Sequence, residues 1–410
     1  MFLKQQIMRR VLYPLAAIGL WSVYLYGWRV LALATVVFLL GILTEAVFES
    51  SRNKKPSEAV LVTCALLTLS LPPGVPLWVA AVGIVFAVLF GKEVYGGFGR
   101  NVFNPAITGR TFTYISFPLM MQTTWMLPGA FGFGGVNGLV QHSVWVEALF
   151  VILVVVILYS FVIKNIGKNK ILTCGIIVAV AVTIGFYVFS AYGGLRSTKF
   201  PWNEVDVVTM ATPIEIFKGL AQQNNWHPKA GYEYLLDNNA LSLFFGFRVG
   251  SIGEGAIFLI LLSGIYLLWT KTANWRPLFW TLFSSLVLTV IFYYSGLMNA
   301  RFPLLSVKPD IAGQFNDILR FMMSGSLCFA AVFMSTDPIS APKKPIAQHI
   351  YGIIIGSLTI VIRVFAGFPE GISFAILTAN TFASLLDEIL PAPQKKQSVK
   401  PDVAATGAGL

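Results

Sequence analysis

Apolar runs close to bilayer-spanning length recur along the whole chain. A transmembrane helix needs about 20 mostly apolar residues, and the clearest runs are 11 to 28, 30 to 48, 144 to 163, 171 to 192, 256 to 269 and 278 to 297. Hydrophobic residues make up 56% of the 410 and charged residues only 11%, too little charge to cover a soluble core of this size. The sequence therefore predicts an all-α polytopic membrane protein.

Basic residues gather in the short loops between these runs. The clusters are Lys4, Arg9 and Arg10; Arg52, Lys54 and Lys55; Lys164, Lys168 and Lys170; Lys271 and Arg276; Lys343 and Lys344; and Lys395, Lys396 and Lys400. Because Lys and Arg are enriched in cytoplasmic loops, a regular alternation of spans places all of these loops in the cytoplasm. Topology thus explains the net charge of +11, and we expect no nucleic-acid partner.

Up to twelve helices can be threaded through the inner membrane of a bacterial or archaeal cell, so we expect about 10 to 12. They are predicted near 11 to 28, 30 to 49, 58 to 71, 76 to 91, 103 to 121, 144 to 163, 171 to 192, 254 to 270, 278 to 297, 316 to 335, 346 to 366 and 371 to 390. Twelve is even, so both termini are expected in the cytoplasm. Gly and Pro shorten or interrupt the third, fourth, fifth and tenth of these helices.

The interruptions come in pairs. The Leu-Ser-Leu-Pro-Pro-Gly stretch at 69–74 breaks the early helices, as 367–371 breaks the late ones, and Asn104-Pro105 is echoed by Asp337-Pro338. Paired breaks in two halves of a chain are typical of an internal inverted repeat whose half-helices build a polar site within the bilayer. Ordinary turns between helices are the alternative.

A glycine-rich turn with two asparagines follows the fourth predicted helix. Gly96 and Gly97 let the backbone approach a ligand closely, and Asn101 and Asn104 offer amide donors and acceptors to a ring with polar edges. A flat heterocycle suits this turn, although a tight cytoplasmic loop explains the glycines equally well. No βαβ unit flanks them, so the turn is not a Rossmann dinucleotide site.

A second motif lies in the long outer loop at 206–215. It reads Asp-Val-Val-Thr-Met-Ala-Thr-Pro-Ile-Glu. Thr212 can cap a short helix, with Pro213 at the first helical position and Glu215 three residues after the cap. That capping box explains the residues without any ligand.

Taken together, these stretches resemble the NqrB/RnfD family, the large membrane subunits of the sodium-translocating NADH:quinone reductase and of the Rnf complex. The matching pieces stand in the family's order and cover well over half of the chain. They are Lys-Glu-Val-Tyr-Gly-Gly at 92–97 with Asn-Pro-Ala at 104–106, Ala-Thr-Pro at 211–213, Gly-Ser-Ile-Gly-Glu at 250–254, Thr-Asp-Pro-Ile-Ser-Ala at 336–341, Ile-Arg at 362–363, and the stretch from Phe368 to Asn380.

The resemblance implies two flavins. In the family, the threonine that corresponds to Thr212 carries FMN through a phosphoester, attached outside the cytoplasm by a dedicated flavin transferase. The surrounding attachment segment corresponds to Asp206, Thr209 and Ala211 here. The family also binds riboflavin beside the glycine-rich turn, where Asn101 and Asn104 match its contact residues, with Gly96 and Gly97 alongside.

The chain departs from the family pattern in two ways. Val207 and Met210 stand where glycine is usual in the attachment segment, and two extra apolar runs interrupt the region from 128 to 202. A pair of spans returns the chain to its original side, so the insertion preserves the predicted external position of Thr212. The expected organisation is a first membrane repeat at 1–127, the inserted helix pair at 128–202, the external loop at 203–253, a second repeat at 254–390 and a cytoplasmic tail at 391–410.

Charges inside the apolar runs are costly facing lipid and should face the bundle or an aqueous path. They are Arg320, Asp337 and Arg363. We expect Asp337 to cap a half-helix and Arg363 to pair with Asp387 or Glu370, and an ion path is the alternative to such structural pairing. The cysteines and histidines have no metal-ligand spacing.

These features predict a membrane flavoprotein subunit of an ion-translocating redox complex. Its flavins would pass electrons and its membrane repeats would contribute to Na⁺ or H⁺ translocation, with no NADH site on this chain and no metal ligands, so electrons must come from partner subunits. Two alternatives remain open. One is the flavin-carrying subunit of a different membrane reductase system, and the other is a non-redox transporter or channel with an inverted repeat.

Overall fold

The computed structural model describes residues 2–126 and 240–391, except for positions 28, 123, 247, 299–301, 303–309 and 367–370. Within these ranges the secondary structure is helical, with no β-strand and one isolated bridge between Leu3 and Ser57. The predicted all-α fold is thus confirmed. The predicted inserted helix pair, the loop segment that contains Thr212 and the C-terminal tail lie outside the described residues.

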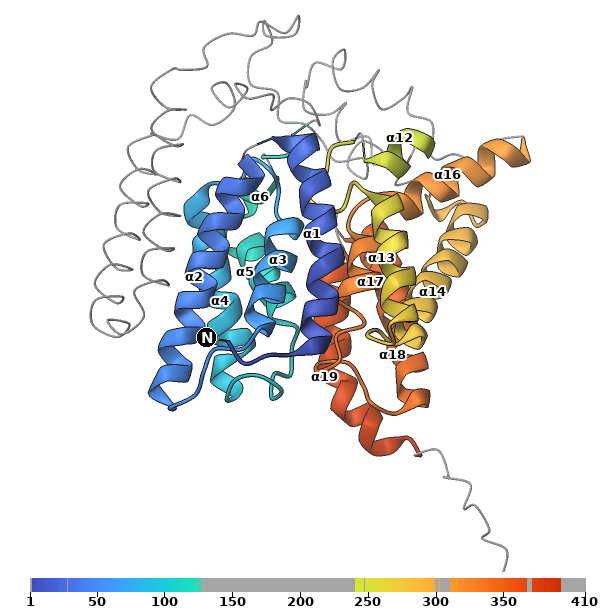
Figure 1. Cartoon of the computed structure of the whole chain (residues 1–410). Helices are drawn as coiled ribbons and strands as arrows, with labels where there is room; N and C mark the ends of the chain where they lie inside the picture. Colours follow the sequence, from blue (N-terminus) through green and yellow to red (C-terminus); the bar gives the residue numbers. More distant parts are fainter. Residues whose placement is uncertain are drawn as a thin grey trace, which may run out of the picture.

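The first group of helices is coloured blue to cyan in Figure 1 and the second yellow to red. The first comprises α1 (Gln6–Tyr26), α2 (Arg29–Ser51), α3 (Ala59–Ser70), α4 (Leu77–Gly91), the 3₁₀ turn η1 (Glu93–Tyr95), α5 (Pro105–Ser116) and α6 (Pro118–Gln122). The second comprises α12 (Ala240–Phe245), α13 (Ile257–Trp269), α14 (Trp275–Tyr294), α16 (Ile311–Met323), α17 (Leu327–Phe333), α18 (Pro345–Phe365) and α19 (Ile372–Ile389).

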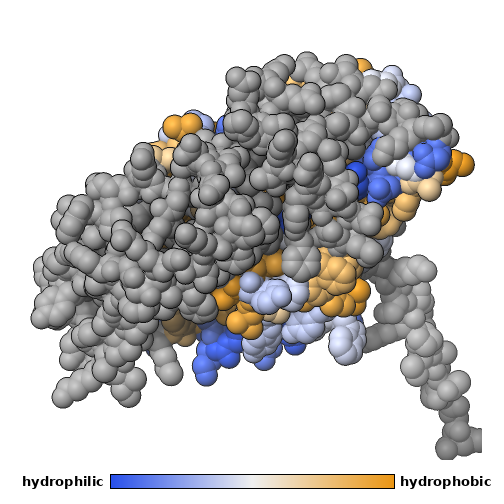
Figure 2. Space-filling view, turned by 90° about the horizontal axis from the view of Figure 1, so that it is seen from above, coloured by the Kyte–Doolittle hydropathy of each residue, from blue (hydrophilic) through white to orange (hydrophobic). Residues whose placement is uncertain are grey.

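Five of the described helical segments are long and apolar enough to cross a membrane. They are α2, the stretch Leu77–Tyr95, α14, α18 and α19. Large apolar side chains point outward, as lipid-facing residues do; Leu20 is 73% exposed and Trp269 is 83% exposed. Figure 2, seen from above, shows apolar patches beside polar ones in the part of the described surface that is visible. These features confirm a polytopic membrane protein.

Two short helices end inside the bundle. Helix α3 has 12 residues, about 18 Å at 1.5 Å per residue, well short of a hydrocarbon core of about 30 Å. It stops where Pro72 and Pro73 follow. The predicted tenth span is two helices, α16 and α17, separated at Ser324, Gly325 and Ser326, where Gly325 has a φ of 67°. The expectation of short or interrupted third and tenth helices is confirmed.

The two groups repeat one packing scheme. Helix α2 packs on α4 and α4 on α5, just as α14 packs on α18 and α18 on α19. Helix α3 starts beside the N-terminal segment and ends beside Ile252, whereas α17 starts beside Arg248 and ends at the pocket that contains Met8. The two half-helices therefore run in opposite directions, in agreement with the predicted inverted repeat.

The predicted pairing of the breaks is wrong in detail. In the structure, the segment after α3 (Leu71 to Gly74) corresponds to the segment after α17 that contains Asp337, because each follows the half-helix of its repeat. The turn before α5 corresponds to the link between α18 and α19. Asn104 and Asp337 are therefore not related by the repeat, and both lie at one end of the bundle, in one pocket.

Side-chain contacts bring the described basic loops to the same end of the bundle. Arg9 pairs with Glu58, and the Arg52 guanidinium lies 2.9 Å from the Glu93 carboxylate. Arg10 donates a hydrogen bond to the carbonyl of Thr270 (3.1 Å). We call this the basic end; its cytoplasmic location remains a prediction from the charge pattern.

Helices α14 and α18 meet along a glycine seam. A Cβ atom at Gly352 would stand 2.8 Å from the Cβ of Trp280 and 2.9 Å from the carbonyl of Pro277. One at Gly356 would overlap the carbonyl of Thr281 and the hydroxyl of Ser284. Only glycine allows the two backbones to approach this closely, as in other membrane helix pairs with small residues four apart.

Candidate functional site

A pocket lies at the basic end, between the two repeats. Helices α1 and α3 contribute Met8, Val62 and Leu66, while the second repeat contributes Phe333 and Asp337. The cavity volume of the pocket is about 60 Å³, or about 650 Å³ when all the space out to its open mouth is counted. Most of the wall is apolar, with a few polar groups converging on it.

Asn101 and Asn104, the predicted contact residues, both line this pocket. Asn104 Oδ1 accepts hydrogen bonds from the backbone N–H of Ala106 (3.0 Å) and Ile107 (3.3 Å). With Pro105 at the first helical position, this is the N-cap of α5. Asn101 Nδ2 donates to the carbonyl of Phe103 (3.1 Å). These local bonds fix both amides on the pocket wall.

The glycines of the same turn do not line the pocket. Gly96 and Gly97 have φ values of 105° and 91°, which favour glycine. A Cβ at Gly97 would overlap the Glu49 carboxylate, and one at Gly96 would lie 3.2 Å from the Arg100 side chain. Turn geometry and close packing thus explain these glycines, as the tight-loop alternative expects. Their place beside a ring stays a prediction.

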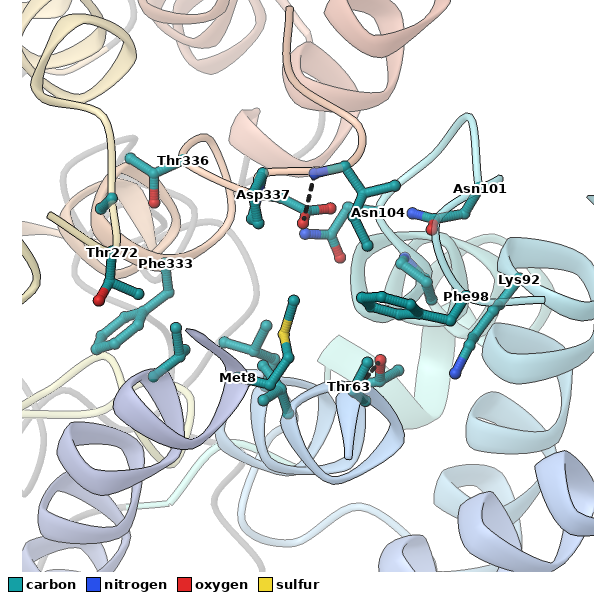
Figure 3. Close-up of a pocket in the computed structure, with 18 of the residues that line it drawn as sticks. Met8, Thr63, Lys92, Phe98, Asn101, Asn104, Thr272, Phe333, Thr336 and Asp337 are labelled. Carbon is teal, nitrogen blue, oxygen red and sulfur yellow. Dashed lines mark hydrogen bonds between the residues drawn. The ribbon is translucent and has the colours of Figure 1, made fainter. Parts of the chain in front are cut away.

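Phe98 and Lys92 supply a feature that sequence reasoning missed. The Lys92 ammonium lies 5.9 Å from the centroid of the Phe98 ring, and Figure 3 shows Phe98 at the pocket with Lys92 beyond it. Lys92 Nζ contacts Glu45 Oε2 at 2.5 Å and donates to Ser57 Oγ at 2.8 Å. The Ser57 N–H and hydroxyl donate to the other Glu45 oxygen. The signal in the sequence was Glu45, an acid inside an apolar run.

Asp337 stands beside Asn104 at one side of the pocket (Figure 3). Its Oδ1 accepts a hydrogen bond from the N–H of Ile339 (3.3 Å), and its Oδ2 accepts one from the hydroxyl of Ser340 (2.7 Å). The carboxylate therefore closes the turn after α17 and does not begin a regular helix. This corrects the expected half-helix cap, although the side chain still faces the pocket.

Arg363 lies far from the pocket, and its predicted pairing with Asp387 is wrong. The guanidinium is fully buried and donates to the carbonyls of Phe321 (3.3 Å) and Ser324 (3.0 Å). Asp387 instead accepts hydrogen bonds from the N–H groups of Lys343 and Lys344, at the other end of α18. The alternative partner, Glu370, lies outside the described residues.

Arg320, the third predicted intramembrane charge, is also outside the pocket. It forms an ion pair with Asp317, 3.9 Å away on the same helix. The attachment segment with Asp206, Thr209, Ala211 and Thr212 belongs to the part of the chain that the structure does not describe.

Comparison with known proteins gives a consistent result. The family described as NQR2, RnfD, RnfE matches residues 3–395. The NqrB-type subunit of the Na⁺-translocating NADH-quinone reductase of Chlamydia felis is 30% identical over 404 residues, covering 90% of this chain and 76% of the relative. The RnfD-type subunit of the ion-translocating oxidoreductase complex of Stutzerimonas stutzeri is 29% identical over 391 residues, covering 94% of this chain and 90% of the relative.

Proposed function

Because the chain belongs to the NQR2, RnfD, RnfE family, and the relatives described above are subunits of ion-translocating oxidoreductase complexes, we propose that it is the flavin-carrying membrane subunit of such a complex. It carries FMN covalently on Thr212 and riboflavin in the pocket at the basic end. It contributes to the translocation of Na⁺ or H⁺, and partner subunits supply and remove the electrons. Its termini are cytoplasmic and the 203–253 loop is external, where a flavin transferase reaches Thr212.

The pocket is the observation that supports the riboflavin site. A flavin is a flat ring with one polar edge, and the pocket offers apolar walls, the Phe98 ring and the amides of Asn101 and Asn104. Aromatic stacking and amide hydrogen bonds suit the two parts of such a ring. The residues present therefore fit the group, and the bound flavin would supply the electron-transfer chemistry.

The protein's own residues would position the ring. Because the Asn104 carbonyl is occupied by the N-cap, the Nδ2 group of its amide is the part that would donate to a ligand. In Asn101 it is the Nδ2 group that is already bonded, to the Phe103 carbonyl, so its Oδ1 would accept a hydrogen bond from a ligand. One donor and one acceptor on neighbouring residues match the alternating polar edge of a flavin.

The covalent site rests on the motif and the family. A phosphoester needs a hydroxyl in an accessible loop, and Thr212 occupies the family's attachment position. Thr212→Val keeps the shape and removes the oxygen, so it should abolish the FMN mass increment and the in-gel fluorescence of the denatured protein. Thr209→Val is the matched control and should keep both. Wild-type protein without an FMN increment on the peptide containing Thr212 would refute the covalent site.

The second flavin has a separate test. Asn101→Leu combined with Asn104→Leu should remove the riboflavin that is extracted on denaturation while leaving the covalent flavin in place. An unchanged amount of extractable flavin would move the site elsewhere. A protein lacking both flavins would instead favour a non-redox transporter, the alternative to which broken helices of opposite direction also point.

A further inference from the structure

A buried irregular segment, which we call the linker, spans 246–255 and lies between helix ends of both repeats, at the end of the bundle opposite the basic end. It joins α12 to α13, and position 247 is not described. Arg248 and Ser251 are fully buried, and Glu254 is 2% exposed. Non-helical backbone at membrane depth is tolerated only where protein groups satisfy its hydrogen bonds. The linker therefore depends on the helix ends that it contacts on either side.

On one side the linker binds the end of α3. The N–H groups of Ile252 and Gly253 donate to the carbonyls of Leu71 (3.1 Å) and Leu69 (2.7 Å). Carbonyls in the last turn of a helix have no partner within the helix. The hydroxyl of Ser22 on α1 donates to the Ile252 carbonyl at 2.8 Å. The linker thus completes the break in the first repeat.

On the other side the linker binds the break between α16 and α17. Arg248 Nη1 donates to the Met323 carbonyl, and Nη2 donates to the carbonyls of Gly325 (3.3 Å) and Glu254 (2.7 Å). A cation suits this position because the C-terminus of a helix carries partial negative charge. One guanidinium therefore holds the second break and also the turn that contains Ile252 and Gly253.

We infer that Arg248 is a positioning residue that couples the two helix breaks, so that a displacement of the α16–α17 break is transmitted to the end of α3. Arg363 provides the contrast within the same protein. It is equally buried and donates to carbonyls of the same break, Phe321 and Ser324. However, it comes from α18, so these bonds connect two elements of the second repeat. Arg248 joins the repeats through the linker, whereas Arg363 braces the break from within one of them.

Hydrogen–deuterium exchange of the purified complex tests this difference. In Arg248→Met, amides in both 318–328 and 66–76 should exchange about tenfold faster, because lost buried hydrogen bonds lower the free energy of local opening. In Arg363→Met, faster exchange should be confined to 318–328. If Arg248→Met affects only 318–328, or neither region, Arg248 is a local cap at most and the inference fails.

A milder variant guards against loss of the fold. Arg248→Lys keeps the charge but cannot bridge three carbonyls as a planar guanidinium does. It should accelerate exchange in both regions, less than Arg248→Met does. Acceleration restricted to 318–328 would overturn the coupling with this variant too.

The consequence for ion movement rests on the proposed function. In proteoliposomes that contain the whole complex, ²²Na⁺ uptake and a pH-sensitive dye report the ions moved per electron, with NADH and a reduced low-potential dye each tested as donor and NAD⁺ and a short-chain quinone as acceptors. This ratio should fall in Arg248→Met and stay at the wild-type value in Arg363→Met. A wild-type complex that moves no ions would refute the proposed function but leave the exchange result standing, whereas a normal ratio in Arg248→Met would refute the inference alone.

Discussion

The two ends of the bundle bury charge in different ways. At the basic end, Lys92 and Glu45 form a direct ion pair, and Ser57 occupies the remaining carboxylate oxygen. At the opposite end, Arg248 and Arg363 donate to backbone carbonyls of a broken helix. In the first case each charge depends on one opposite charge. In the second, a cation is shared among several neutral acceptors.

The two kinds of buried charge therefore have different roles. The arginines satisfy carbonyls that the break leaves without helical partners. The Lys92–Glu45 pair instead lies behind Phe98, at the wall of the pocket. Helix interruption therefore explains the charge of these two arginines, whereas the Lys92–Glu45 pair borders the candidate site.

The largest effect is expected from breaking the buried pair. Lys92→Met leaves the Glu45 carboxylate without its cation and should lower the free energy of unfolding by about 3–5 kcal/mol. Glu45→Gln should be similarly harmful. The double variant should recover most of this loss, because no uncompensated charge remains. Thermal unfolding in detergent measures all three; a double variant as unstable as the sum of the single variants would contradict the pairing.

Removing an arginine at the opposite end should cost less. Arg363→Met leaves the carbonyls of Phe321 and Ser324 without this donor, and a buried unsatisfied neutral group costs about 1–3 kcal/mol. The same unfolding assay provides the comparison. A loss greater than that of Lys92→Met would show that the two ends do not differ as described.

A smaller effect on stability is expected at Asn104, where two substitutions distinguish helix capping from flavin binding. Asn104→Ala removes the N-cap of α5 and should cost about 1 kcal/mol. Asn104→Asp keeps the capping oxygen but lacks the amide donor, so stability should be retained while extractable riboflavin falls. Retained flavin in the aspartate variant would limit Asn104 to its capping role.

The smallest effect concerns pH at the basic end. The Arg9 guanidinium, followed by the N–H of Gln5, holds the pKa of Glu58 below its ordinary value. Glu58 is thus a stronger acid in the folded state, and its contribution to stability is present above the ordinary pKa of about 4.3 and lost as pH falls through the folded value. Unfolding temperatures measured as the pH is lowered from about 6 to about 3 should decline less in Glu58→Gln than in the wild type. Equal declines would contradict this.

Much of the fold could be predicted because hydrophobic runs and proline positions are local signals. The end of α3 and the interruption before α17 follow from Pro72 and Gly325. The correspondence between breaks was wrong because both Asn-Pro and Asp-Pro favour similar turns, whatever their place in a repeat. A dipeptide of this kind does not indicate in which direction the chain crosses the membrane.

The site was predictable only in part. Asn101 and Asn104 stand in a recognisable motif. The partners of Lys92 lie 35 and 47 residues away along the chain, and the carbonyl partners of Arg363 lie 39 and 42 residues away. Arg363 was expected to pair with Asp387 or Glu370. The structure places its guanidinium on carbonyls of a break far away in the sequence, and Glu370 lies outside the described residues. Long-range partners of this kind depend on tertiary packing.

The glycine seam between α14 and α18 limits how the second repeat can deform. Since Gly352 and Gly356 have no side chains, the two backbones are in direct contact, and sliding one helix along the other would drive main-chain atoms into overlap. The two helices therefore form a rigid pair, and α16 and α17 pack against α14. Gly325 is the point within this repeat where the helix is already interrupted, and its backbone adopts a left-handed conformation that few other residues tolerate, so we expect α16 to move relative to α17 by bending there.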